Sequence, residues 1–115
     1  MEETLIKPMI EPEVAFVLGK PLRSRNIFVN DVMRATDYVT PTLEIVDSCI
    51  KDWNIKWVDT VADNGSSARF VLSDRAFSPS GIDSRTLGMV IEKNRSTFAT
   101  AAMAEVLGNP ARAVC

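Results

Sequence analysis

Two glutamates, Glu11 and Glu13, stand near the start of a run of apolar, β-branched and aromatic residues that extends from Ile10 to Leu18. On a β-strand, alternate side chains share a face, and residues two positions apart are separated by about 6.5–7 Å. Both carboxylates are therefore expected on one side of the strand. Like charges held this close repel each other unless a cation or a proton lies between them. The pair is a candidate ligand set for a hard divalent metal ion, or else it lines the wetted face of an ordinary half-buried strand.

A third acid, Glu44, lies within the apolar segment from Leu43 to Asp47. This segment is more typical of a strand than of a helix, because isoleucine and valine favour pleated surfaces. A carboxylate inside such a run either faces solvent or is held inside by a partner. The sequence favours the solvent-facing position slightly and leaves both open.

The absence of histidine limits the chemistry that this chain can perform. It excludes Ser-His-Asp and Cys-His catalysis and any histidine-ligated metal site within the sequence. The remaining chemical groups are carboxylates, lysine, tyrosine, hydroxyls, and water on an oxygen-bound metal.

The elements that must position these acids are mostly short strands. Arg69–Leu72 predicts a strand after an Asn64-Gly65 turn, and the segments 87–92 and 97–102 predict a hairpin. Several large apolar side chains are expected in the core. On the first strand and in the tryptophan-containing segment these are Ile10, Val14, Phe16, Leu18, Trp53 and Trp57.

Two brief helices are also expected. Asn30 or Asp31 can cap a helix over residues 32–36, and Asn109 precedes Pro110 in the pattern of an N-cap followed by proline at the first helical position.

Length and composition set further bounds. A chain of 115 residues that is 46% hydrophobic suits one domain, residues 1–115, with a modest core. The net charge of −2, with basic residues scattered along the chain, predicts no nucleic-acid partner. No apolar run approaches the roughly 20 residues of a membrane helix, and no signal peptide opens the chain. Cys49 and Cys115 have no metal-ligand spacing and are expected to be reduced thiols of a cytoplasmic protein.

Several long segments of the chain resemble, in the same order, the 2-keto-4-pentenoate hydratase family of the fumarylacetoacetate hydrolase superfamily. They include Glu11-Pro12-Glu13-Val14-Ala15-Phe16 within residues 7–22, then residues 35–39, 43–48, 52–53, 59–64 and 108–110. The resemblance implies that Glu11, Glu13 and Glu44 are the carboxylate ligands of Mg²⁺ or Mn²⁺. It also implies that the hydroxyl of Ser66 meets the carboxylate end of the substrate, although that hydroxyl could instead cap a turn shaped by Asp63 and Asn64.

The resemblance further implies a metal-dependent hydratase that adds water to 2-hydroxypenta-2,4-dienoate to give 4-hydroxy-2-oxopentanoate, a step in the meta-cleavage degradation of aromatic compounds. The expected fold class is α+β, a mixed and curved β-sandwich roll with few short helices, incomplete in this chain. Family members form homo-oligomers, and the same tendency is expected here. A catalytic acid or base remains unknown, because the segment that carries the family's lysine has no counterpart in this sequence.

Two alternatives to the hydratase stay open. The segment from Gly65 to Phe70 resembles the related 2-oxo-3-hexenedioate (4-oxalocrotonate) decarboxylases, and a catalytically inactive truncated subunit could bind metal or partner chains only. The chain also departs from the family pattern. Cys49 replaces a usual arginine, and residues that are commonly glycine are here Arg95, Ala101 and Met103. A non-glycine residue forced into a left-handed turn costs about 1–2 kcal/mol, so strain is expected at these positions.

Overall fold

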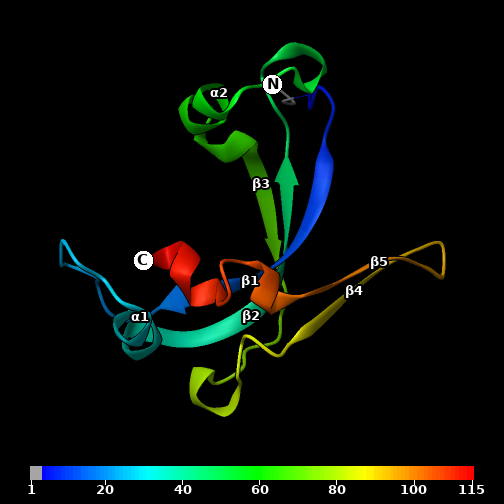
Figure 1. The fold of residues 1–115 in the computed structure, drawn as a ribbon. Coiled ribbons are helices and arrows are strands. Elements are labelled where there is room, and N and C mark those ends of the chain that lie inside the picture. Colours follow the sequence, from blue (N-terminus) through cyan, green and yellow to red (C-terminus); the bar gives the residue numbers. More distant parts are fainter. Residues whose placement is uncertain (1–3) are drawn as a thin grey trace. The chain divides into compact units, whose positions relative to one another are not determined.

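The computed structural model describes residues 4–115 and is built mainly of strands with a few short helices (Figure 1). A three-stranded sheet has the order β1-β2-β3, and a two-stranded sheet consists of β4 and β5. The strands are β1 (Met9–Leu18), β2 (Thr36–Val46), β3 (Ser67–Leu72), β4 (Gly88–Lys93) and β5 (Ser96–Ala102). The helices are α1 (Val29–Ala35) and α2 (Trp57–Ala62), with short 3₁₀ segments between elements. The expected mixed α+β class, with strands dominating, is confirmed.

The chain divides into two compact units. The first extends to Glu13 and continues from Thr42 to Leu72, and the second comprises Val14–Pro41 and Ser73–Cys115. A single domain over residues 1–115 stays a prediction.

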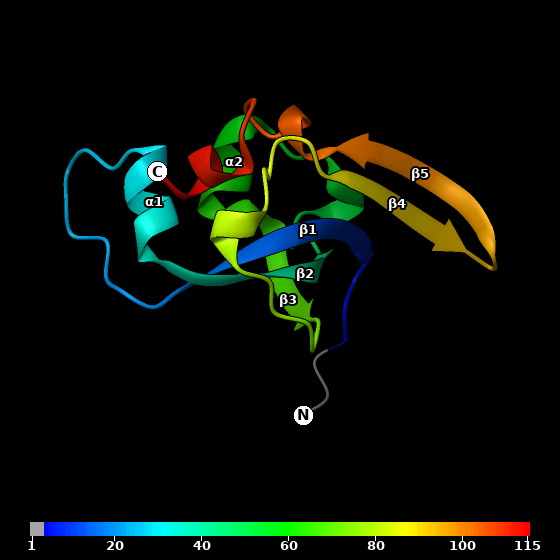
Figure 2. The same cartoon turned by 90° about the horizontal axis from the view of Figure 1, so that it is seen from below.

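The first unit contains the part of the three-stranded sheet that carries the glutamates. β2 and β3 are neighbouring strands (Figure 2) and pair in antiparallel fashion. Glu44 lies opposite Phe70, and the register shifts between Ile45 and Val46. Val46 and Ser66 are buried, and α2 contacts the 3₁₀ turn η2 (Asn64–Ser66). The predicted strand and turn in this region are confirmed.

The second unit is organised around α1, which contacts the 3₁₀ helix η5 (Pro110–Val114). Its buried apolar side chains are Val32, Ala35, Val39, Met103 and Ala111. The predicted hairpin is present as β4 and β5, which pair from Gly88↔Ala102 to Lys93↔Ser96 (Figure 1).

The helix caps differ in their agreement with the sequence. The cap of η5 is confirmed, since the side chain of Asn109 accepts a hydrogen bond from the N–H of Ala111 at 3.0 Å. The prediction that Asn30 or Asp31 caps α1 is wrong. The helix begins at Val29, after Phe28, and Asp31 acts from its third position by accepting the N–H of Phe28 at 3.0 Å. The carboxylate therefore satisfies a free N–H from inside the first turn rather than from in front of it.

The predicted core of the first strand and of the tryptophan-containing segment is partly wrong. Ile10, Leu18 and Trp57 are 61%, 40% and 81% exposed, whereas Val14, Phe16 and Trp53 are half-buried. β1 lies at one edge of its sheet, and α2 buries no side chain within the described residues. An apolar pattern marks a face that can be buried, but burial also requires a second layer to cover it.

The expected backbone strain is present at one of the departures from the family pattern and absent at two others. Arg95 has a positive φ of 66° next to Asn94 at 53°, so the strain expected at this turn is present. Ala101 lies in β5 and Met103 begins the 3₁₀ helix η4 (Met103–Glu105), neither with a positive φ, so the expectation of left-handed strain is wrong there. Among the described helices, none is both long enough and apolar enough to cross a membrane.

Candidate metal centre

Neighbouring strands bring the three predicted glutamates together. Glu11 and Glu13 are two positions apart on β1 and so share one face of the strand. Glu44 lies on β2, which is next to β1 in the sheet. One carboxylate oxygen from each residue lies within 4.8 Å of the others. All three acids belong to the first unit. Glu44 is half-buried and lies beside the exposed Glu11 and Glu13. Its position is therefore intermediate between the two orientations that the sequence left open.

The electrostatics of this cluster are unfavourable to three ionised groups. The pKa of Glu13 is raised above its ordinary value, first because neighbouring atoms partly desolvate this otherwise exposed carboxylate, and then because Glu44 and Glu11 repel its negative charge. Either a proton or a cation between the carboxylates relieves this repulsion.

The donor set suits a hard divalent cation. Carboxylate oxygens are the ligands that magnesium and calcium prefer, with metal–oxygen distances of about 2.0–2.1 Å and 2.3–2.6 Å respectively. The oxygens of the three glutamates lie within 4.8 Å of one another, so small side-chain movements would bring them to a common ion of either kind. Glu11 and Glu13 are exposed, which leaves positions for water or an oxygen ligand.

Asp47, which follows β2, connects the segment before β1 to the end of β2 through hydrogen bonds. The carboxylate of Asp47 accepts the N–H of Ile6 at 2.6 Å and the N–H of Lys7 at 2.7 Å. The indole N–H of Trp53 donates to the carbonyl oxygen of Lys7 at 3.0 Å. These bonds fix the segment that leads into Glu11 and so help to hold β1 beside Glu44.

Ser66, the predicted substrate-binding residue, belongs to a hydrogen-bond network centred on Asp63 rather than on Asp47. It is 2% exposed and has a φ of 58°, and its hydroxyl donates to the carboxylate of Asp63 at 2.8 Å. The expectation that Asp63 and Asn64 shape this turn is confirmed, since Asn64 has a positive φ of 52°. The role of Ser66 toward substrate stays a prediction.

Asp63 collects further donors that the sequence did not reveal. The thiol of Cys49 donates to it at 2.9 Å, and the hydroxyl of Ser48 donates at 3.2 Å. The hydrogen bond from Cys49, followed by that from Ser66, lowers the pKa of Asp63, while the same contact raises the pKa of the Cys49 thiol. The sequence marks Cys49 only as a replacement for arginine, and its separation of 14 positions from Asp63 provides no local signal for this contact.

Comparisons with known proteins agree with the geometry. No family model matches the chain. It is 47% identical over 114 residues to a 2-hydroxypent-2,4-dienoate hydratase of Pseudomonas putida, covering 99% of this chain and 51% of that protein. It is 46% identical over 110 residues to a 2-keto-4-pentenoate hydratase of Paraburkholderia xenovorans (strain LB400), covering 96% and 41%.

A solved structure is similar in fold as well as in sequence. It is the 4-oxalocrotonate decarboxylase from Pseudomonas putida G7, complexed with magnesium and adipate. The TM-score is 0.87 at 42% identity, over 93% of this chain and 41% of that chain. The chain thus spans about half, or somewhat less, of the length of the relatives that it matches.

Proposed function

We propose that this chain, over the part of its relatives that it spans, is a member of the 2-keto-4-pentenoate hydratase family and carries the metal-binding part of a hydro-lyase. The proposed reaction adds water to 2-hydroxypenta-2,4-dienoate and gives 4-hydroxy-2-oxopentanoate. The observation that supports it most strongly is the meeting of the Glu11, Glu13 and Glu44 carboxylates within 4.8 Å. The β-sandwich roll of the superfamily is the proposed fold of the complete protein.

The proposed cofactor is one Mg²⁺ or Mn²⁺ ion. A divalent cation draws electrons from the 2-oxygen of a chelating 2-oxo acid, which makes the conjugated alkene accept water. In the net reaction the 2-hydroxyl loses its proton and C5 gains one, which leaves a double bond between C3 and C4. Water then supplies a hydroxyl to C4 and a proton to C3. The three glutamates would hold the ion, and the exposure of Glu11 and Glu13 would leave room for water or substrate.

We propose that Ser66 orients the carboxylate end of the substrate. Its hydroxyl has one proton, which points to Asp63 in the absence of substrate. Binding of a substrate carboxylate would require that proton to turn away, and Cys49 and Ser48 would continue to satisfy Asp63. Ser66→Ala is therefore expected to raise the KM for the dienoate more than it lowers kcat.

The test measures binding and turnover separately on the full chain. Calorimetric titration with Mn²⁺ is followed by assays with 2-hydroxypenta-2,4-dienoate and with the oxalocrotonate-type dicarboxylate. Metal binding with hydration of the dienoate supports the proposal. Turnover of the dicarboxylate alone supports the decarboxylase alternative, which the similarity to the 4-oxalocrotonate decarboxylase favours.

Metal binding without either activity would support the third candidate, an inactive subunit that binds metal or partner chains. Absence of metal binding, with Glu44→Ala behaving like the parent, would remove the hydratase proposal altogether.

Two coarser properties complete the proposal. Every residue of the edge strand β3 is exposed, including Phe70, Val71 and Leu72, and an exposed apolar edge favours self-association. We therefore propose a homo-oligomer, which a monomeric mass in light scattering would contradict. Cys49 and Cys115 are free thiols, which supports a cytoplasmic location.

A further inference from the structure

The second unit contains a hollow with an excess of positive charge. Its volume is about 390 Å³, and it lies between the loop that follows β1 and the helix α1. Three cationic side chains line it, Lys20, Arg23 and Arg34, against one acidic side chain, Asp31. These residues are scattered in the sequence, and the fold gathers them.

The described part of the chain does not neutralise these cations. The side chains of Lys20, Arg23 and Arg34 are exposed and make no hydrogen bond or ion pair within residues 4–115. Asp31 forms no ion pair with them within residues 4–115, and one of its carboxylate oxygens accepts the N–H of Phe28. Like charges gathered without a partner repel one another, and an anion between them removes that repulsion.

Apart from the hydroxyl of Ser24, the rest of the hollow's lining is apolar. Its lining includes Pro21, Leu22, Ile27 and Ala35. Inorganic anions would use only the cationic rim, whereas an anion with a short carbon chain would also bury apolar surface. The lining therefore favours an organic ligand.

The start of the loop that carries Lys20 and Arg23 is anchored by backbone hydrogen bonds. The N–H groups of Gly19 and Lys20 both donate to the carbonyl oxygen of Ala35, at 2.8 and 3.2 Å. Farther along the loop, the N–H of Asn26 donates to the hydroxyl of Ser24 at 3.2 Å. A site whose walls are already ordered loses less conformational entropy on binding.

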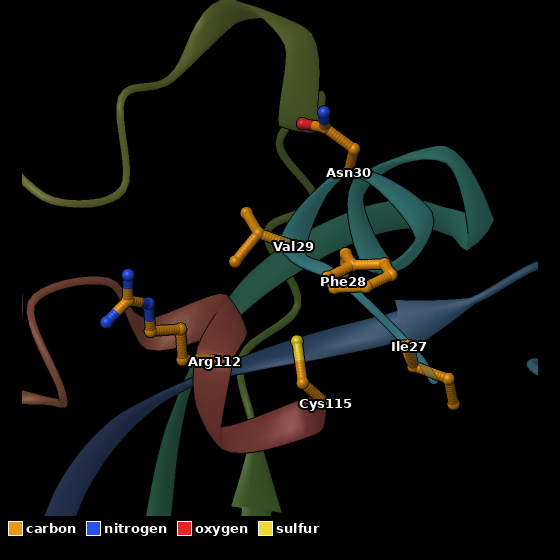
Figure 3. Close-up of a pocket in the computed structure, with 6 residues that line it drawn as sticks. All are labelled: Ile27, Phe28, Val29, Asn30, Arg112 and Cys115. Carbon is orange, nitrogen blue, oxygen red and sulfur yellow. The ribbon is translucent and has the colours of Figure 1, made fainter. Parts of the chain in front are cut away.

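A neighbouring hollow of the same unit provides a contrast. It also has a volume of about 390 Å³ and is lined by Ile27, Phe28, Val29, Asn30, Arg112 and Cys115 (Figure 3). Its single cation, Arg112, already donates to the carbonyl oxygen of Leu107 at 3.4 Å. Equal volume with one partnered cation does not favour an anion, so the charge of the first hollow distinguishes it.

We propose that the hollow formed by residues 20–24 and α1 binds a small organic dianion, a dicarboxylate of about the size of succinate. Two carboxylates match an excess of two positive charges, and the carbon chain lies on the apolar lining. All residues of this site belong to the second unit, whereas the glutamate cluster belongs to the first. The proposal therefore does not depend on the hydratase activity.

The test is a ¹⁵N NMR titration of the metal-free full chain with succinate at constant ionic strength. We expect saturable shifts in the amides of residues 20–24 and 34–35, with a Kd of about 1–10 mM, which corresponds to a weak but specific contact. Propionate, with one carboxylate, and sulfate, with no carbon chain, are each expected to bind at least about fivefold more weakly.

The variants decide which side chains are responsible. R23E/R34E is expected to abolish the saturable shifts, while R75E/K93E, which changes the net charge equally at exposed positions of the same unit, is expected to retain them. If the charge reversal unfolds the protein by circular dichroism, R23Q/R34Q replaces it, with at least a tenfold loss of affinity expected. Linear shifts without saturation, unchanged binding in the arginine variants, or sulfate binding as tightly as succinate would overturn the proposal.

Discussion

Two acidic regions of the first unit have opposite environments. The cluster of Glu11, Glu13 and Glu44 has other carboxylates as neighbours, and the pKa of Glu13 is raised by partial desolvation and by their charges. Asp63 has hydrogen-bond donors as neighbours, Cys49 and Ser66 among them, and its pKa is lowered. A carboxylate that the chain itself supplies with donors stabilises a turn. Carboxylates that face one another are stabilised by a proton or by an external cation, and this difference separates a structural acid from the proposed metal ligands.

The largest expected effect separates the two regions by metal affinity. Glu44→Gln is expected to weaken Mg²⁺ or Mn²⁺ binding by about 100-fold or more, because it removes one of three charged ligands. Asp63→Asn is expected to change the affinity less than about threefold, since Asp63 is outside the cluster. Calorimetric titration of both variants beside the parent measures the contrast.

The control for this contrast is thermal unfolding without metal. Asp63→Asn is expected to lower Tm, because it removes the charge that accepts hydrogen bonds from Cys49 and Ser66. If Asp63→Asn weakened metal binding as much as Glu44→Gln, the distinction between the two regions would be wrong.

The next effect is a pH dependence of opposite sign in the two regions. The folded state holds the proton of Glu13 more tightly than the unfolded state does. The stability of the metal-free protein should therefore fall as pH rises from about 4.5 through the raised pKa. Asp63, with a lowered pKa, contributes stability above about 3.8 that is lost as pH falls through its folded pKa.

Glu13→Gln tests the first half of this pH dependence. In metal-free protein the variant should match the parent below about pH 4.5 and have the higher Tm above it, because the glutamine carries no charge to repel its neighbours. Added Mn²⁺ should reverse the order at neutral pH by stabilising the parent. An equal Tm for both proteins across pH 4–8 without metal would contradict the repulsion.

A smaller effect is expected at Ser66. Ser66→Ala removes one donor to Asp63 and should reduce the free energy of unfolding by about 1 kcal/mol. The binding of Mn²⁺ should be unchanged. Urea unfolding measures the first quantity, and a loss of metal affinity would indicate that the turn and the glutamate cluster are coupled.

The smallest effect provides a reference outside both regions. Arg95 lies at a positive φ of 66° in the turn between β4 and β5. Arg95→Gly relieves about 1–2 kcal/mol of backbone strain but adds unfolded-state entropy, so a net stabilisation of about 0.5–1 kcal/mol is expected. Ala101→Gly, at a position without positive φ, is the matched control and should not stabilise.

The sequence predicted those features that depend on local geometry. The two-residue period of a strand was enough to place Glu11 and Glu13 on one face, and Asn109 before Pro110 was enough to predict a cap. Glu44 was assigned only through the family resemblance, because its own segment allowed two orientations. The topology of the sheet decides which strands are neighbours, and a local sequence pattern does not reveal that topology.

Two kinds of feature could not be predicted from the sequence. These are the burial of a side chain by another element and contacts between residues that are distant in the sequence. The 81% exposure of Trp57 contradicts its apolar character, because burial depends on whether another element packs against it. Likewise Lys20, Arg23 and Arg34 come together only because the loop after β1 is bound to the end of α1. The link between Asp63 and Cys49 arises in the same way from the path of the chain.

The most direct test of the glutamate centre is paramagnetic broadening of the ¹⁵N NMR spectrum by Mn²⁺. Substoichiometric Mn²⁺ should broaden the amides around Glu11, Glu13 and Glu44 first, and excess Mg²⁺ should restore them by competition. Broadening centred on Asp63 or spread over the exposed acids, with the amides of residues 11, 13 and 44 unaffected, would contradict the account.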